Sequence, residues 1–200
     1  QELLALKTED LHQLMRDFMS FKHRISYIGN REPAEIAKII EESGHRYKET
    51  PPHTPLRYER PAKPKVFFTH RDMVQSQVGL FAADEVLKPE HVVDYTFFRQ
   101  YLGGDMSAVL FQEIREARSL AYTTWGGYRY AGHKGDDNMV YGGLGCQADK
   151  TVEATTLLRE LVKSPPWSEN RFQETAKAIE ENYRTNPIDF RSIPGVLISW

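Results

Sequence analysis

The sequence predicts an α+β fold in which an antiparallel-rich mixed sheet is covered by helices. Segments with the two-residue period of a strand are intermixed along the chain with segments of helical period, which is typical of this class. Two glycine-rich alternating segments, 120–130 and 139–146, are separated by the polar stretch 132–138, which predicts a β-hairpin. An apolar content of 40% and an aromatic content of 12% are sufficient for a real core.

The first 44 residues have the pattern of a helix, a strand and a second helix. We expect Thr8 to cap the first helix and Pro33 to lie in the first turn of the second, with a strand over 23–28 between them. The apolar face of the first helix is expected to contain Leu11, Leu14, Met15 and Phe18, and the inward face of the second Ile36, Ile39 and Ile40. Because so few elements cannot bury their own surface, 1–44 is interpreted as the C-terminal piece of a preceding α+β domain.

Residues 45–64 are predicted to link two domains. Their prolines lie among charged and polar residues, a composition that favours extended chain: Pro51, Pro52, Pro55, Pro61 and Pro64. Residues 65–200 then belong to the following α+β domain.

This second domain is expected to begin with strands over 65–70 and 74–82. Helices are expected over 91–101 and about 106–118, separated by Gly103-Gly104. The apolar face of the second of these helices contains Met106, Val109, Leu110, Ile114 and Ala117. After the hairpin, the pattern predicts a helix marked by apolar residues over 152–162 and a last helix capped by Ser168.

The charge and hydropathy of the chain exclude two classes of partner. A net charge of −2 and a pI near 6.4 lack the basic footprint of nucleic-acid-binding proteins. No apolar stretch approaches the ~20 residues of a membrane span, so we expect a soluble protein, cytoplasmic or periplasmic.

Histidine spacing predicts that this chain binds no catalytic metal. None of its seven histidines forms H-E-x-x-H or the inverted H-x-x-E-H, whose paired histidines hold zinc on one helix face. The nearest approach, Leu87-Lys-Pro-Glu-His91, has leucine at the first ligand position and proline inside. The chain alone is therefore expected to be proteolytically inactive.

One long motif connects the second helix of this domain to the hairpin. It reads Leu102-Gly-Gly-Asp-Met-Ser-Ala-Val-Leu-Phe-Gln-Glu-Ile-Arg-Glu-Ala-Arg-Ser-Leu-Ala-Tyr122. It places Arg115 seven residues before Tyr122, across a helix-to-strand junction. From the residues alone, Arg115 could complement the helix dipole or pair with Glu116, and Tyr122 could serve packing. An arginine and a phenol side by side could also bind peptide carbonyl groups.

The whole motif resembles a signature of the pitrilysin/insulinase family of zinc metallopeptidases, in the non-catalytic C-terminal half that lacks zinc ligands. The resemblance implies a metalloenzyme half-domain of this type, which ends at Trp200 before it is complete. It implies that zinc lies in a catalytic partner half, in the same longer chain or a separate subunit. It also implies that Arg115 and Tyr122 bind an extended peptide substrate, with Tyr122 stabilising the transition state in trans.

The sequence departs from the family pattern at two positions, and two functions other than substrate binding in a protease are also possible. Asp105 stands where small residues are commoner, and Ser119 replaces the usual glycine before Leu120. The family also includes catalytically inactive members that serve as structural or scaffold subunits. A peptide-binding domain without catalysis is the third alternative.

Overall fold

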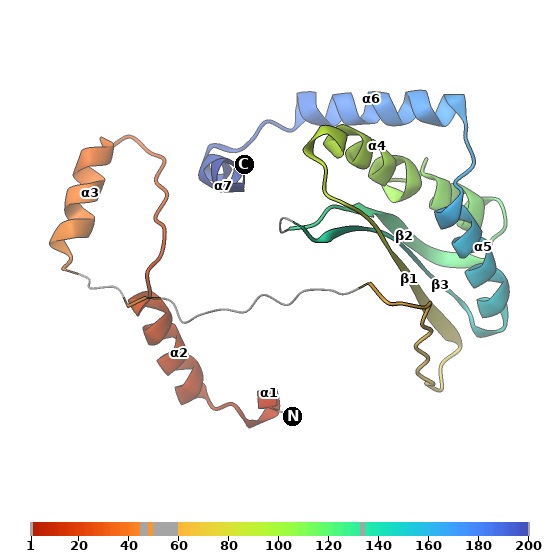
Figure 1. Cartoon of the computed structure of the whole chain (residues 1–200), viewed down its shortest axis with the longest axis horizontal. Helices are drawn as coiled ribbons and strands as arrows, with labels where there is room; N and C mark the ends of the chain where they lie inside the picture. Colours follow the sequence, from red (N-terminus) through yellow and green to blue (C-terminus); the bar gives the residue numbers. More distant parts are fainter. Residues whose placement is uncertain (1, 45–47, 50–59, 133–134, 200) are drawn as a thin grey trace. The chain divides into compact units, whose positions relative to one another are not determined.

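The computed structural model describes residues 2–44, 48–49, 60–132 and 135–199 (Figure 1). The chain divides into two compact units, one formed by Gln1–Leu56 with Pro187–Trp200 and the other by Arg57–Asn186. The second unit combines a three-stranded antiparallel sheet with several helices, which confirms the predicted α+β class. The domain boundaries expected from the sequence, 1–44, 45–64 and 65–200, stay predictions.

The first unit contains α1 (Glu2–Ala5), α2 (Thr8–Ser20), α3 (Pro33–Glu42), a 3₁₀ turn η4 (Phe190–Ser192) and α7 (Ile193–Ser199). Pro33 lies in the first turn of α3, as predicted. The predicted cap of α2 is wrong by one residue, because Lys7 is the N-cap and Thr8 is already helical. The backbone N–H of Lys7 donates to the Asp10 carboxylate at 2.9 Å, so the side chain that closes this helix start comes from the third helical position.

Two expectations for the first unit are wrong. Residues 23–28 form no strand, and the bridge found nearby joins Phe21 to Lys48 in parallel. The apolar faces of α2 and α3 are not buried either: Phe18 is 72% exposed, and α3 has no buried residue. Both outcomes share one cause, since the described residues of this unit form no sheet to pair with a strand or to cover a helix face.

The sheet of the second unit consists of β1 (Gln75–Val86), β2 (Ala121–Arg129) and β3 (Asp137–Gln147) in the order β1-β3-β2. Strands β2 and β3 pair in antiparallel register, which confirms the predicted hairpin. Strand β1 is longer than predicted, and its alternate residues Ser76, Val78 and Leu80 are half-buried. The strand predicted over 65–70 is absent, because its apolar residues Val66, Phe67 and Phe68 are exposed and no described strand pairs with them.

Helices cover the sheet of this unit (Figure 1). They are a 3₁₀ turn η1 (Pro89–His91), α4 (Val92–Gly103), a π-helix η2 (Phe111–Glu116), a 3₁₀ turn η3 (Ala148–Lys150), α5 (Thr151–Lys163) and α6 (Glu169–Thr185). Helices α4 and η2 pack against β2, α5 packs against β3 and β1, and α6 packs against α4. Ser168 caps α6 as predicted, because its hydroxyl accepts from the N–H of Arg171 at 3.3 Å. The fully buried residues between the helices and the sheet include Leu102, Leu110, Ile114, Leu144 and Leu158.

The helix predicted over 106–118 starts later than expected. Asp105 accepts hydrogen bonds from the N–H and the hydroxyl of Ser107, at 2.7 and 2.6 Å, and this turn holds the chain out of helical geometry until Val109. Met106 is therefore 72% exposed instead of buried, and Ala117 is exposed at the other end. The central residues Val109, Leu110 and Ile114 are buried as predicted.

Candidate functional site

The helix that carries Arg115 is a π-helix. The N–H of Ala117 donates to the carbonyl of Gln112, five residues earlier, at 2.9 Å. Such widened turns are rare and are frequently found at functional sites. Arg118 donates from Nη1 to the carbonyl of Glu113 at 2.7 Å, which satisfies one of the free carbonyls that a helix end leaves.

The exit from this helix places Tyr122 beside it. Ser119 has a φ of 51°, in the left-handed region, and its N–H donates to the carbonyl of Arg115 at 3.0 Å. Strand β2 then begins with an irregularity, because Ala121 pairs with Cys146 while Thr123 pairs with Gly145. Tyr122 is thus the extra residue of a β-bulge, a device that redirects a side chain. Its side chain is 74% exposed although Ala121 before it is buried.

The structure brings the predicted pair together. The guanidinium carbon of Arg115 lies 5.5 Å from the centre of the Tyr122 ring. The same carbon lies 4.7 Å from the centre of the Phe111 ring, so the guanidinium contacts two aromatic side chains. Phe111 was not singled out from the sequence. Its spacing of four residues before Arg115 on a helix is the signal that indicates this contact.

Arg115 also forms the ion pair with Glu116 that was considered as its alternative role, but this ion pair is weak. Arg115 Nε and Glu116 Oε1 are 3.6 Å apart, and both side chains are about half exposed. Exposed ion pairs contribute ~0–1 kcal/mol, similar to an exposed cation–π contact. Within the described part of the chain, the Tyr122 hydroxyl has no hydrogen-bond partner. Both side chains therefore keep donor groups that a ligand can use.

Arg171 of α6 fixes the segment that carries Arg115. Arg171 donates from Nε to the carbonyl of Ser107 at 3.1 Å, and its Nη2 lies 3.6 Å from Glu113 on η2. Ile114, next to Arg115, is fully buried in the core. An exposed guanidinium is thus mounted on a fixed helix, which is the arrangement a binding site needs.

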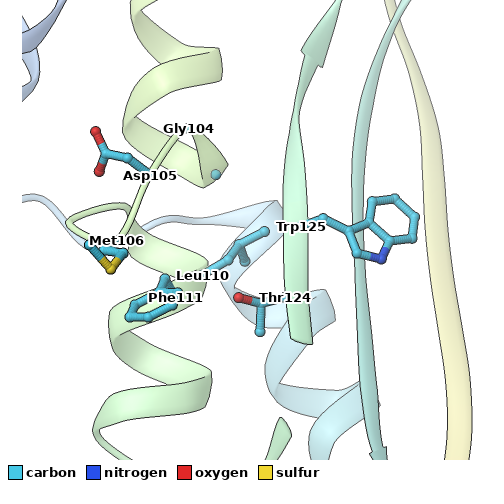
Figure 2. Close-up of a pocket in the computed structure, with 8 residues that line it drawn as sticks. Gly104, Asp105, Met106, Leu110, Phe111, Thr124 and Trp125 are labelled. Atoms are coloured by element: carbon cyan, nitrogen blue, oxygen red, sulfur yellow. The ribbon is translucent and has the colours of Figure 1, made fainter. Parts of the chain in front are cut away.

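A pocket of about 210 Å³ lies between the α4–η2 junction and β2 (Figure 2). It is lined by Gly103, Gly104, Asp105, Met106, Leu110, Phe111, Thr124 and Trp125. Figure 2 shows Leu110 extending toward β2 and Thr124 facing it from that strand, while the Asp105 carboxylate and the Trp125 ring point away. Gly103 is required there, because a Cβ on it would lie 2.4 Å from the carbonyl oxygen of Gly126.

Zinc does not fit the side chains of the described residues. Among them, no group of three or more His, Cys, Asp or Glu side chains could hold a metal ion. A polar cluster surrounds Glu85, whose carboxylate accepts hydrogen bonds from Lys88, Tyr95 and His91. These bonds lower the pKa of Glu85 to about 2, so the cluster stabilises a charged, structural carboxylate. No helix in the described segments is long and apolar enough to cross a membrane.

Comparison with known proteins identifies the family. Residues 6–177 match the family model described as the peptidase M16 inactive domain. Over 83 residues, the chain is 36% identical to the uncharacterized zinc protease YmxG of Bacillus subtilis, a match that covers 38% of this chain and 20% of that protein.

Solved structures share the fold. A peptidase M16 inactive domain from Pseudomonas fluorescens superposes with a TM-score of 0.60 at 18% identity, over 84% of this chain and 40% of that one. The periplasmic protease PqqL from Escherichia coli gives a TM-score of 0.62 at 18% identity, over 85% of this chain and 19% of that one. The chain thus spans less than half the length of these relatives. The family match confirms the resemblance found in the motif, and the chain belongs to the M16 peptidase inactive-domain family.

Proposed function

We propose that this chain is the non-catalytic, substrate-binding half of a zinc-dependent metalloendopeptidase. The observation that carries the proposal is the contact of Arg115 with Tyr122, two exposed side chains with free donors on a fixed helix and a bulged strand. Membership of the inactive-domain family and the similarity to a zinc protease support the same assignment.

The two side chains suit different parts of a peptide bond. The Tyr122 hydroxyl donates to the carbonyl oxygen of the bond under attack as that oxygen gains negative charge. The Arg115 guanidinium, which has five N–H donors, binds a neighbouring carbonyl and holds the peptide in place. A catalytic half, in the same longer chain or a separate subunit, supplies the zinc that activates water. Tyr122 therefore acts in trans.

An extended peptide fits beside this pair. Among the described strands, β2 has a partner on one side only, so one row of its backbone groups is unpaired. Peptides add to such strand edges through main-chain hydrogen bonds. Because Tyr122 lies at the start of β2, a peptide paired along this edge has one end next to the Arg115–Tyr122 pair.

Steady-state kinetics of the complete protease on a flexible peptide test the proposal. Loss of one oxyanion donor lowers kcat by ~10²–10³ in comparable sites, so we expect Tyr122→Phe to reduce kcat by about this factor. We expect Arg115→Ala mainly to raise KM, because it binds the substrate away from the reacting bond. Tyr130→Phe and Arg129→Ala, partly exposed residues near the far end of β2, are the matched controls and should retain wild-type kinetics.

Zinc content and thermal unfolding should be unchanged in all four variants. If Tyr122→Phe and Arg115→Ala retain wild-type kcat/KM, the pair serves only helix-end packing. The scaffold function then becomes the better assignment.

A further inference from the structure

We infer that the pocket between the α4–η2 junction and β2 binds an apolar side chain of the peptide that Arg115 and Tyr122 contact. This inference rests on the proposed function and adds a preference for one kind of substrate residue. The pocket adjoins the pair through Phe111, which lines the pocket and whose ring also contacts the Arg115 guanidinium.

The wall of the pocket offers apolar contacts and no available charge. Leu110, which is buried, and Phe111, which is half-buried, line it together with Met106, whose exposure places it at the mouth. The Asp105 carboxylate points away and is bound by Ser107 and Gln100 (Figure 2). A charged side chain would lose its hydration in this pocket without gaining a partner.

The back of the pocket is rigid and its mouth is adaptable. Gly103 and Gly126 bring the backbones of α4 and β2 into direct contact, and a Cβ on Gly126 would lie 2.3 Å from Cδ1 of Leu110. Met106 at the mouth is unbranched, so it can adjust to side chains of different shape. The volume of about 210 Å³ is several times the ~30 Å³ that a water molecule occupies, which leaves room for one leucine or phenylalanine side chain.

The spacing along β2 fixes which substrate residue enters. Thr124 follows Tyr122 by two residues, a distance of ~7 Å in a strand. A peptide paired along β2 therefore places in the pocket a side chain about two residues from the carbonyl that Tyr122 contacts. Complete burial of a leucine or phenylalanine side chain corresponds to roughly 10–100-fold in affinity.

Nuclear magnetic resonance of the 200-residue chain, labelled at the methionine methyl groups and the tyrosine rings, tests this inference. The probes are blocked alanine/threonine heptapeptides with leucine, phenylalanine, alanine or glutamate at the centre. Met106→Leu and Tyr122→Phe identify the two signals to follow. We expect the Met106 signal to move with the leucine and phenylalanine peptides at roughly 10–100-fold lower concentration than with the alanine or glutamate peptide. Met73, exposed and outside the pocket, serves as the internal control.

Two variants then test whether peptide binding depends on the pocket and not on another part of the surface. Met106→Glu places a carboxylate at the mouth and should weaken binding of the leucine peptide about tenfold or more, whereas Met73→Glu should leave it unchanged. If the Tyr122 signal moves while Met106 does not, or if all four peptides bind equally, the pocket assignment is wrong and the proposed function survives. If neither signal responds to any peptide, both are wrong.

Discussion

Replacing Ser119 by glycine should stabilise this protein, although the change removes a side chain. Ser119 has a φ of 51° at the junction between η2 and β2. A left-handed backbone costs a residue with a Cβ ~1–2 kcal/mol, and glycine is free of that cost. Glycine in turn lowers the stability of the folded protein by ~0.4–1 kcal/mol, because it gives the unfolded chain more conformational freedom. The difference predicts a net gain of ~0.5–1 kcal/mol for Ser119→Gly.

Ser164 provides the matched control for this substitution. It ends α5 with a φ of −148°, a conformation that any residue adopts. Ser164→Gly should therefore show only the unfolded-state loss of ~0.4–1 kcal/mol, and the two variants should differ by ~1–2 kcal/mol. The hydrogen bond that Ser119 donates to Arg115 comes from its backbone N–H, so Ser119→Gly should leave the Arg115–Tyr122 contact unchanged.

Urea unfolding followed by tryptophan fluorescence measures both variants. With a slope of ~1–3 kcal/mol per M, the predicted gain moves the midpoint of Ser119→Gly upward by a few tenths of a molar unit. A midpoint for Ser119→Gly equal to or below that of Ser164→Gly would show that the junction is not strained. The account of how β2 begins would then have to be abandoned.

Three further outcomes test the fold by the same unfolding assay. Leu158→Ala, in the buried core, should lower the free energy of unfolding by ~2–5 kcal/mol. Val152→Ala, on the exposed side of the same helix, should change it by less than ~0.5 kcal/mol, and similar losses in the two variants would contradict the described core. Gly103→Ala should destabilise because its Cβ would overlap the backbone of β2, whereas Gly132→Ala, which has open space around it, should not; equal stability of the two would refute this close approach. Glu85 has a pKa lowered to about 2, so its stabilising effect is complete above the ordinary pKa of ~4.3 and is lost as the pH falls toward 2. Glu85→Gln should thus be less stable than the wild type near pH 6, with a gap that narrows between pH ~4.5 and ~2; a gap independent of pH would exclude this linkage.

The sequence could predict the hairpin, the helices α4, α5 and α6, and the buried residues of η2. Each of them follows from a local pattern that agrees with the tertiary structure. Val109, Leu110 and Ile114 have helical spacing and are buried. The strands expected over 23–28 and 65–70 have equally good local patterns but no described partner. A strand depends on hydrogen bonds to a neighbour, and a period of two in one segment says nothing about that neighbour.

The sequence singled out the two residues of the candidate site, whose role stays a prediction, but it did not predict their geometry. The motif singled out Arg115 and Tyr122, and the structure places them in contact. The widened helix, the left-handed Ser119 and the bulge at Tyr122 carry no pattern of their own, since each depends on where the neighbouring elements pack. Met106 shows the same limit, because its helical spacing predicted burial and the turn at Asp105 left it exposed.

Because of the π-helix, the Arg115–Tyr122 contact depends on the number of residues between the two side chains as well as on which residues they are. The hydrogen bond from Ala117 to Gln112 encloses one residue more than an α-helical turn, and each helical residue rotates the chain by ~100°. Deleting one exposed residue here, such as Ala117, would restore ordinary helical spacing while Ile114 keeps its place in the core. The connection from Arg115 to Tyr122 would be one residue shorter, so the turn at Ser119 and the bulge at Tyr122 could not both form as they do here, and Tyr122 would no longer contact Arg115. A chain that retains both residues with one fewer between them would therefore have the composition of this site without its contact.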